Sequence, residues 1–174
     1  MTGKSLSDAI VFIGPMASGK SSIGRQVAEQ LSIPFIDTDE QIIAEHGPIT
    51  EIFATQGEAV FRRLEEIAVT KALSQPGRRV VSLGGGAILS EKTRAALKNH
   101  TVILLMTDEE TVLSRANLDK RPLLKNDPQA WSRLLQQRLP LYTEVATKTF
   151  EVARLPKDVS AKKIVLWLET EVYA

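Results

Sequence analysis

The stretch Gly-Pro-Met-Ala-Ser-Gly-Lys-Ser-Ser at residues 14–22 constrains the fold more than any other part of the chain. It matches the phosphate-binding pattern G-x-x-x-x-G-K-[ST] at every fixed position, which are Gly14, Gly19, Lys20 and Ser21. An apolar, β-branched run at 9–13 precedes it and predicts a buried strand, and apolar residues at helical spacing follow it. A strand that enters a helix through such a turn aims backbone N–H groups at one point, where the helix N-terminus adds partial positive charge. The stretch therefore predicts a nucleotide-binding loop.

The side chains of this loop are expected to contact different parts of a nucleotide and its metal ion. Lys20 is expected to neutralise the β- and γ-phosphates, and the Ser21 hydroxyl to bind Mg²⁺. Ala17, Ser18 and Ser22 complete the predicted nucleotide contacts of the loop. The alternative is a Gly/Ser-rich turn that merely joins a strand to a helix. The match at all fixed positions, in the right context, disfavours it.

Length and composition narrow the class of protein. A chain of 174 residues predicts one domain over 1–174, and its 43% hydrophobic and 25% charged residues are ordinary for a globular protein. The net charge of +1 gives no strong attraction to nucleic acid or to an anionic membrane. The absence of cysteine excludes disulfides and thiolate metal sites, and it fits a reducing cytosol. We see no apolar run long enough for a signal peptide or a membrane span, so we expect a cytoplasmic protein.

Two carboxylates follow a short predicted strand at 35–37. Asp37 and Asp39 would lie at the ligand edge of a sheet that already carries a phosphate loop. One could hold Mg²⁺ through water, and the other could contact the group that accepts the phosphate. The competing interpretation is that an aspartate caps the helix that begins near Glu40. The two roles are compatible, one for each aspartate.

Residues 40–75 predict helices with breaks near 46–48 and 56–57. The longest runs over 58–73, and we expect its apolar stripe, Ile67 included, to be buried. The charged residues around the rest of this helix are Arg62, Arg63, Glu65 and Glu66. A solvated face with ion pairs is the simplest interpretation of such charges, and we prefer it for Arg63 and Glu66.

Three consecutive glycines, Gly84, Gly85 and Gly86, follow a buried strand predicted at 80–83. Glycine is costly in backbone entropy, so the run indicates either close approach of the backbone to a ligand or a flexible turn. Further on, residues 115–125 predict a polar, cationic loop that ends regular structure at Pro122. Such a loop would serve as a lid over the phosphates, or it would be an ordinary exposed loop. Pro128 to Leu139 predicts a helix that Pro140 interrupts.

The chain as a whole alternates five short apolar strands with helices. This pattern predicts a three-layer α/β fold, with a five-stranded parallel sheet and helices on both faces. Right-handed crossovers place the carboxyl ends of all the strands, and so all the candidate sites, at one edge.

Several separate segments match one family. They are residues 14–22, 35–39, 52–53 with 57–65, Leu83 to Gly86, 121–124 and Arg138-Leu139-Pro140-Leu141-Tyr142. On these segments the chain resembles the shikimate kinase family of nucleoside monophosphate kinase-like P-loop enzymes, from Ile10 to about Leu168. The resemblance implies ATP-dependent phosphorylation of a shikimate hydroxyl to give shikimate 3-phosphate and ADP. It also implies Mg²⁺ and a cytoplasmic monomer on the aromatic amino-acid pathway.

The resemblance also implies roles for single residues. Asp39 matches the carboxylate that contacts the shikimate hydroxyls and lies nearest the acceptor oxygen. Arg62 and Arg138 match the arginines that grip the substrate carboxylate, and the backbone at Gly84 to Gly86 lies against the same substrate. A guanidinium group pairs with a carboxylate through two parallel hydrogen bonds, which suits this task.

The remaining implied roles concern the nucleotide. Arg121 matches the lid arginine that reaches the phosphates, and Asp37 matches the carboxylate that holds Mg²⁺ through water. Arg115 and Arg154 fall where the family frames adenine, although the segment 154–160 is atypical. The lid stretch 116–120 also lacks the glycines often seen there.

Three other functions compete with this one. A related kinase of the same fold could act on gluconate or on an aminated shikimate analogue. The arginine pair and the glycine turn favour shikimate over gluconate, but they fit an analogue that keeps the ring carboxylate. A regulatory nucleotide-binding domain would have a damaged constellation, whereas Lys20, Asp39 and Arg121 are all present. A nucleic-acid-modifying NTPase is disfavoured by the near-neutral net charge.

Overall fold

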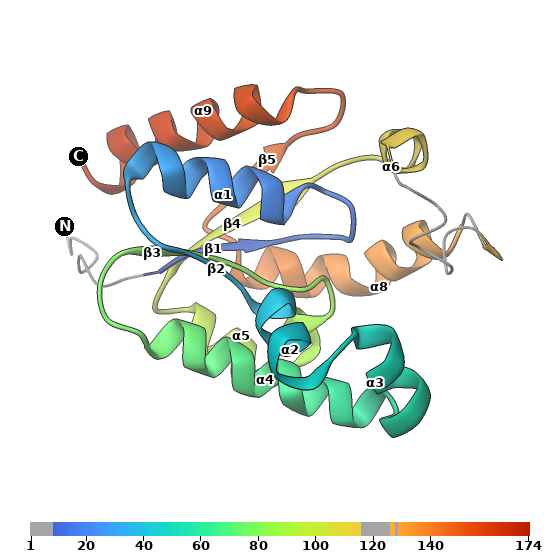
Figure 1. Ribbon diagram of the computed structural model, residues 1–174. Coiled ribbons are helices and arrows are strands. Elements are labelled where there is room, and N and C mark those ends of the chain that lie inside the picture. Colours follow the sequence, from blue (N-terminus) through green and yellow to red (C-terminus); the bar gives the residue numbers. More distant parts are fainter. Residues whose placement is uncertain (1–8, 116–125, 128) are drawn as a thin grey trace.

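All strand pairs in the sheet are parallel, and the strands follow the order β2-β3-β1-β4-β5 (Figure 1). The computed structural model describes residues 9–115, 126–127 and 129–174. The strands are β1 (Ala9–Ile13), β2 (Phe35–Asp37), β3 (Arg79–Ser82), β4 (Thr101–Met106) and β5 (Lys148–Glu151). The predicted five-stranded parallel sheet is thereby confirmed.

Helices cover both faces of this sheet (Figure 1). In chain order they are α1 (Lys20–Leu31), α2 (Thr38–His46), α3 (Ile49–Gln56), α4 (Glu58–Ser74), η1 (Ala87–Leu89), α5 (Glu91–Leu97), α6 (Glu109–Arg115), α8 (Ala130–Val145), α9 (Lys157–Trp167) and η3 (Leu168–Val172). Helices α1 and α9 lie on one face, and α4, α5 and α8 lie on the other.

Strand β1 lies at the centre of both apolar layers. Ile10 and Phe12 pack in the cluster with α1 and α9, whereas Val11 and Ile13 pack in the cluster with α4, α5 and α8. Successive side chains of a strand point to opposite faces, so a strand covered on both faces must be apolar throughout. Each fully buried side chain of this size contributes about 1.5–3 kcal/mol. This burial fixes the position of the loop that follows β1.

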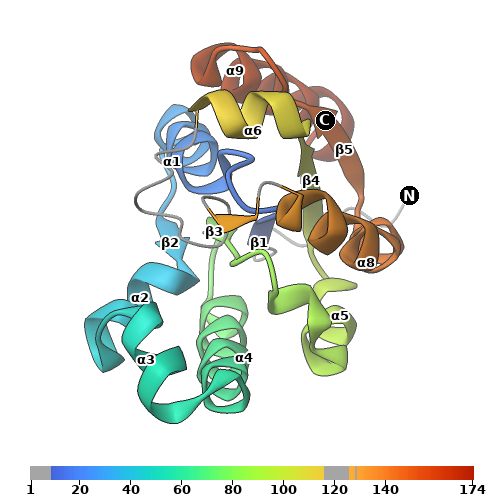
Figure 2. The ribbon, with the colours of Figure 1, turned by 90° about the vertical axis from the view of Figure 1, so that its right-hand side faces the viewer.

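A third, smaller apolar cluster joins α2, α3 and α4 away from the sheet (Figure 2). The predicted breaks between these helices are confirmed, because α2 ends before Gly47 and α3 ends before Gly57. Both glycines have φ near +87°, a conformation that residues with a Cβ rarely adopt. The three helices form a subassembly beside the carboxyl ends of β2 and β3.

The structure departs from the sequence predictions at several elements. Helix α8 continues through Pro140 to Val145, although we expected the proline to interrupt it. Ile67 is 60% exposed rather than buried, because the buried face of α4 runs along Phe61, Glu65 and Ala68. The predicted lid lies outside the described residues apart from Arg115, and so does Arg121. In the described parts of the chain, no helix combines the length and apolarity that a bilayer span requires.

Candidate active site

Three residues of the loop between β1 and α1 have positive φ, and two of them are glycines. Gly14 and Gly19 have φ values of +145° and +89°, and Ala17 between them has φ +62°. A Cβ on Gly14 would stand 2.4 Å from the carbonyl oxygen of Leu105, at the end of β4. The hydroxyl of Ser18 is buried and has no hydrogen-bond partner among the described residues. A buried, unpaired hydroxyl in such a loop points to a ligand that is bound there during function.

Lys20 begins α1 and curls back over this loop. Its Nζ donates hydrogen bonds to the carbonyl oxygens of Gly14 and Pro15, each at 2.9 Å. Only 9% of the side chain is exposed. The ammonium group therefore lies against the loop, and its role in neutralising phosphate charge stays a prediction.

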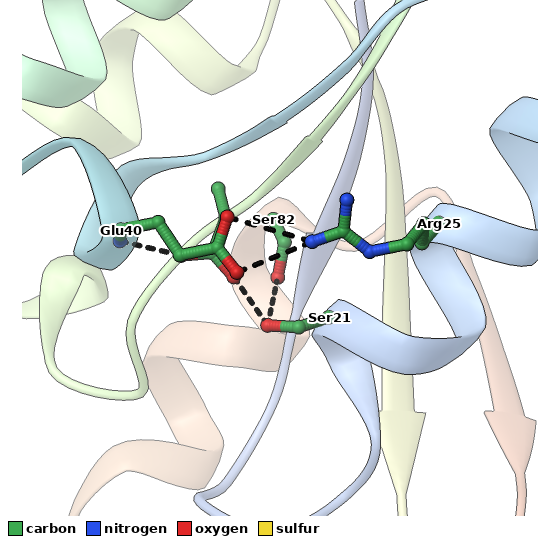
Figure 3. Close-up of polar contacts among 5 residues, drawn as sticks. Ser21, Arg25, Glu40 and Ser82 are labelled. Atoms are coloured by element: carbon green, nitrogen blue, oxygen red, sulfur yellow. Dashed lines mark hydrogen bonds and ion pairs between the residues drawn. The ribbon is translucent and has the colours of Figure 1, made fainter.

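Ser21 links the phosphate loop to the neighbouring strand ends. Its hydroxyl donates to the Asp37 carboxylate and lies 3.5 Å from the hydroxyl of Ser82. Figure 3 shows Ser21 on α1 directed toward Ser82, with the ion pair between Arg25 and Glu40 beside them. Asp37 and Ser82 are paired in register at the ends of β2 and β3, which explains why both reach Ser21.

Asp37 also caps the next helix. Its second carboxylate oxygen accepts a hydrogen bond from the backbone N–H of Glu40 at 3.0 Å. The capping interpretation is therefore confirmed for Asp37, and the same carboxylate reaches Ser21 as well. In the described part of the chain, no three or more His, Cys, Asp or Glu side chains group closely enough to hold a metal ion by themselves. The oxygen donors of Ser21 and Asp37 would need ligand phosphates to complete a site for a hard cation.

A cavity of about 510 Å³ opens above the phosphate loop. At one end it is lined by the carboxylates of Asp37 and Asp39 and by the turn at Gly84 and Gly85. At the other end it is lined by Thr107, Thr111, Arg115, Val152, Leu155 and Lys157. The phosphate loop lies between the two ends, as the site of a phosphate chain should lie between the acceptor and the nucleoside.

The nucleoside end holds only one of the two arginines predicted to frame adenine. Arg115 lines the cavity, and its guanidinium donates weakly to the carbonyl oxygen of Leu155 at 3.4 Å. Arg154 pairs with Glu110 at 2.6 Å on the surface and is not among the residues that line the cavity. Lys157, which the sequence analysis did not single out, does line it. The adenine role of Arg154 stays a prediction.

Asp39 presents an unpaired carboxylate to the acceptor end. It lies in the first turn of α2, because the strand ends at Asp37. One oxygen of the Asp39 carboxylate is buried and has no hydrogen-bond partner among the described residues. Burial raises the pKa of Asp39, the negative charge of Asp37 raises it further, and Lys20 opposes the rise. A carboxylate in this state gains from contact with a hydroxyl donor, as a substrate alcohol would provide.

The three-glycine turn brings the predicted acceptor residues together. A Cβ on Gly84 would stand 2.8 Å from an oxygen of Asp39. A Cβ on Gly86 would stand 2.2 Å from a guanidinium nitrogen of Arg62, and one on Gly85 would stand 3.6 Å from a nitrogen of Arg138. None of these glycines has positive φ; a Cβ on Gly84 or Gly86 would displace the charged ends of neighbouring side chains, whereas one on Gly85 would make ordinary contacts. Charged side chains approach the backbone of this turn closely, and the predicted approach of a ligand to it stays a prediction.

The same three side chains face different hollows around this turn. Asp39 lines the phosphate-loop cavity, whereas Arg62 lines a second cavity of about 600 Å³ between α4 and η1. Arg138 lines a small recess with Trp131 and Tyr142. Each side chain lies near one glycine of the turn, but the three do not share one open cavity, so their convergence on one acceptor site stays a prediction.

Glu65 is a buried carboxylate beside the glycine turn that the sequence analysis did not single out. We expected it among the charges around α4, but it is buried on the face that packs against the glycine turn, 3% exposed. It accepts a hydrogen bond from Arg62 at 2.8 Å, and its other oxygen lies 2.9 Å from where a Cβ on Gly84 would stand. Burial raises the pKa of Glu65, and the hydrogen bond from Arg62 opposes the rise. Glu65 lies four residues after Phe61 and three before Ala68, so helical periodicity places it on their buried face. This spacing could have predicted its burial from the sequence.

Comparison with known proteins identifies the family of the chain. The family model described as "SKI: Shikimate kinase" matches residues 16–169. A shikimate kinase of Rhodococcus jostii is 47% identical over 141 residues, which are 79% of this chain and 83% of that protein. One of Streptomyces coelicolor is 43% identical over 155 residues, covering 87% of this chain and 90% of that protein.

A solved structure is also similar along nearly the whole chain. It is the shikimate kinase from Acinetobacter baumannii in complex with shikimate. The two chains superpose with a TM-score of 0.87 at 36% sequence identity, and the match covers 97% of each. Together with the family model and the curated relatives, this similarity shows that the chain belongs to the shikimate kinase family.

Proposed function

We propose that this protein transfers the γ-phosphoryl group of ATP to the 3-hydroxyl of shikimate, which gives shikimate 3-phosphate and ADP. The observation that carries the proposal is that Asp39, Arg62 and Arg138 each lie near a glycine of one turn beside the phosphate loop. Membership of the shikimate kinase family supports the same reaction. Phosphoryl transfer depends mainly on positioning and on neutralising charge, and these residues are suited to both tasks.

The acceptor end would hold shikimate by its carboxylate and its hydroxyls. Arg62 and Arg138 pair with the carboxylate, and Glu65 keeps the Arg62 guanidinium in place by the hydrogen bond described above. Asp39 orients the attacking hydroxyl and accepts its proton as the bond to phosphorus forms. The absence of side chains at Gly84 to Gly86 lets the ring approach the backbone.

The phosphate loop would hold the nucleotide with the phosphates toward Asp39. The backbone at Gly14, Ala17 and Gly19, with the hydroxyls of Ser18 and Ser22, surrounds the phosphate chain, and Lys20 neutralises its β- and γ-phosphates. Arg115 is proposed to contact adenine from the opposite end of the cavity. Arg121, outside the described residues, is proposed to add positive charge to the transferring phosphoryl group.

Ser21 and Asp37 are proposed to hold Mg²⁺ together with the nucleotide. Their oxygen donors fit the preference of Mg²⁺ for hard ligands, and a site with few protein ligands suits an ion that binds mostly to substrate phosphates and water. When bound, Mg²⁺ neutralises charge on the β- and γ-phosphates.

We also propose an organisation and a setting for the enzyme. Residues 1–174 would form a single kinase domain, in which 40–75 are the substrate-binding helices and 115–125 the lid. The enzyme would act as a cytoplasmic monomer in aromatic amino-acid biosynthesis, without nucleic-acid or membrane partners. Its sequence has no cysteine, which suits a reducing compartment.

Release of ADP from MgATP tests the proposed reaction directly. The full chain would be assayed separately with shikimate, aminoshikimate, quinate and gluconate. We expect turnover with shikimate, weaker turnover with acceptors that alter the ring substituents, and none with gluconate, which lacks the ring. Activity on gluconate without activity on shikimate would refute the acceptor assignment.

A further inference from the structure

Lys157 places a second ammonium group beside the phosphate loop. It is the first residue of α9, and its Nζ donates a hydrogen bond to the hydroxyl of Ser22 at 3.1 Å. Its Cε lies 3.9 Å from where a Cβ on Gly19 would stand. Lys157 is therefore held against the amino-terminal turn of α1, although 135 positions separate it from Ser22 in the chain.

The electrostatic surroundings of Lys157 favour an anion that the protein does not supply. The amino-terminal ends of α1 and α9 meet near its side chain, and both carry partial positive charge. Lys20 adds a full charge to the same cavity. Within the parts of the chain that the structure describes, no carboxylate lies within ion-pair distance of Lys157. A cation in this place is stabilised by a negatively charged ligand.

The position of Lys157 in the cavity identifies which part of the nucleotide it meets. Lys20 hydrogen-bonds to the carbonyls at the start of the loop, and Ser21 contacts Asp37 toward the acceptor end. Lys157 hydrogen-bonds to Ser22 on the other side and lines the same cavity as Val152 and Leu155. The anionic group between the β-phosphate and the nucleoside is the α-phosphate.

We propose that Lys157 binds the α-phosphate of the nucleotide and thereby sets the affinity for both ATP and ADP. The inference rests on the proposed nucleotide-binding function and adds a contact to it. The α-phosphate is unchanged by the reaction, so Lys157 stabilises the bound substrate, transition state and product equally. Such uniform binding changes KM and product affinity and leaves the chemical step alone. Lys157 thus differs from Lys20, which is proposed to meet the phosphates that take part in the reaction.

Calorimetric titration of the full chain with ADP and with AMP tests this assignment. We expect Lys157→Ala to weaken both nucleotides by the same factor, about five- to tenfold, equivalent to about 1–1.4 kcal/mol. Lys157→Arg should restore most of the affinity, because a cation of similar reach remains. Lys163→Ala, which removes an exposed lysine from the same helix, is the matched control and should bind both nucleotides as the wild type does.

Other results of these titrations would contradict the proposal in different ways. Unchanged ADP affinity in Lys157→Ala would show that the ammonium group makes no nucleotide contact. A loss for ADP without a loss for AMP would place the contact at the β-phosphate instead. Equal weakening in Lys157→Ala and Lys163→Ala would indicate a general effect of helix charge. Failure of the wild-type protein to bind ADP at all would refute the proposed nucleotide-binding function itself.

Discussion

The hydroxyl of Tyr142 donates a hydrogen bond to the carbonyl oxygen of Gly85 at 2.5 Å. The same hydroxyl lies 3.2 Å from the carbonyl oxygen of Gly14, in the phosphate loop. Tyr142 is 1% exposed, and burial raises the pKa of its hydroxyl, which favours the neutral donor. One side chain therefore ties the nucleotide loop to the acceptor turn. Arg138 lies one helical turn earlier on α8, so the same helix also carries a residue that we propose binds the acceptor.

Tyr142→Phe should loosen the alignment of the two substrates. The ring keeps its packing, but the carbonyls of Gly14 and Gly85 lose their donor, at a cost of about 1–3 kcal/mol. We expect kcat to fall about tenfold, with a smaller change in the affinity for ADP. Steady-state kinetics and ADP titration measure the two effects. Tyr173→Phe, which changes the second tyrosine of the sequence, is the control. An equal fall in the kcat of this variant would contradict the role of Tyr142 in positioning the two substrates.

Asp39→Asn should remove the group that orients the attacking hydroxyl. General-base catalysis contributes about 10²–10⁴-fold to rate, so we expect kcat to fall within that range. The affinity for ADP should stay within about twofold of the wild type, because the phosphate loop is intact. Turnover near the wild-type level in Asp39→Asn would rule out the proposed role.

Asp39 also makes stability depend on pH. Its pKa is raised in the folded state by burial, so the folded protein binds this proton more tightly than the unfolded chain, whose value is near 3.8. The contribution of Asp39 to the free energy of unfolding is therefore most favourable at low pH. It is lost as the pH rises from the pKa of Asp39 in the unfolded chain through its pKa in the folded protein. Asp39→Asn should unfold at a higher temperature than the wild type at pH 8, by about 2–4 °C for each kcal/mol relieved.

Thermal unfolding of both proteins at two pH values tests the direction of this pH dependence. The difference between Asp39→Asn and the wild type should shrink when both are measured near pH 4, where the wild-type carboxyl is protonated for more of the time. A difference that grows on acidification would contradict the raised pKa.

The sequence predicted those parts of the site that depend on local backbone chemistry. The phosphate loop follows from glycines at Gly14 and Gly19 between a strand and a helix, and both have the positive φ that this turn needs. The parallel order of the strands then places Asp37 and Ser82 side by side, as the general rule for such sheets implies. The convergence of Arg62 and Arg138 was expected from the family resemblance rather than from local pattern.

Features that depend on tertiary packing were not predicted from the sequence. Glu65 looks like a solvated charge, and only the glycine turn against α4 reveals that it is buried. Pro140 is a helix breaker in isolation, but α8 continues through it because Tyr142 and Val145 are buried on the far side. Lys157 has no motif at all, and its proximity to Ser22 follows from the packing of α9 on α1.

Arg62→Ala should weaken acceptor binding and destabilise the fold through Glu65. It removes a predicted carboxylate ligand, so we expect the KM for shikimate to rise at least tenfold while ADP affinity is retained. It also leaves the buried Glu65 carboxylate without its donor, which costs about 3–5 kcal/mol when one partner of a buried pair is removed.

The double variant Arg62→Ala with Glu65→Gln separates the two effects, because a neutral amide tolerates the loss of the cation. It should recover much of the lost thermal stability and none of the shikimate affinity. Arg63→Ala, at the adjacent exposed position, controls for loss of charge from α4. Recovery of shikimate binding in the double variant would contradict the contact between Arg62 and the acceptor.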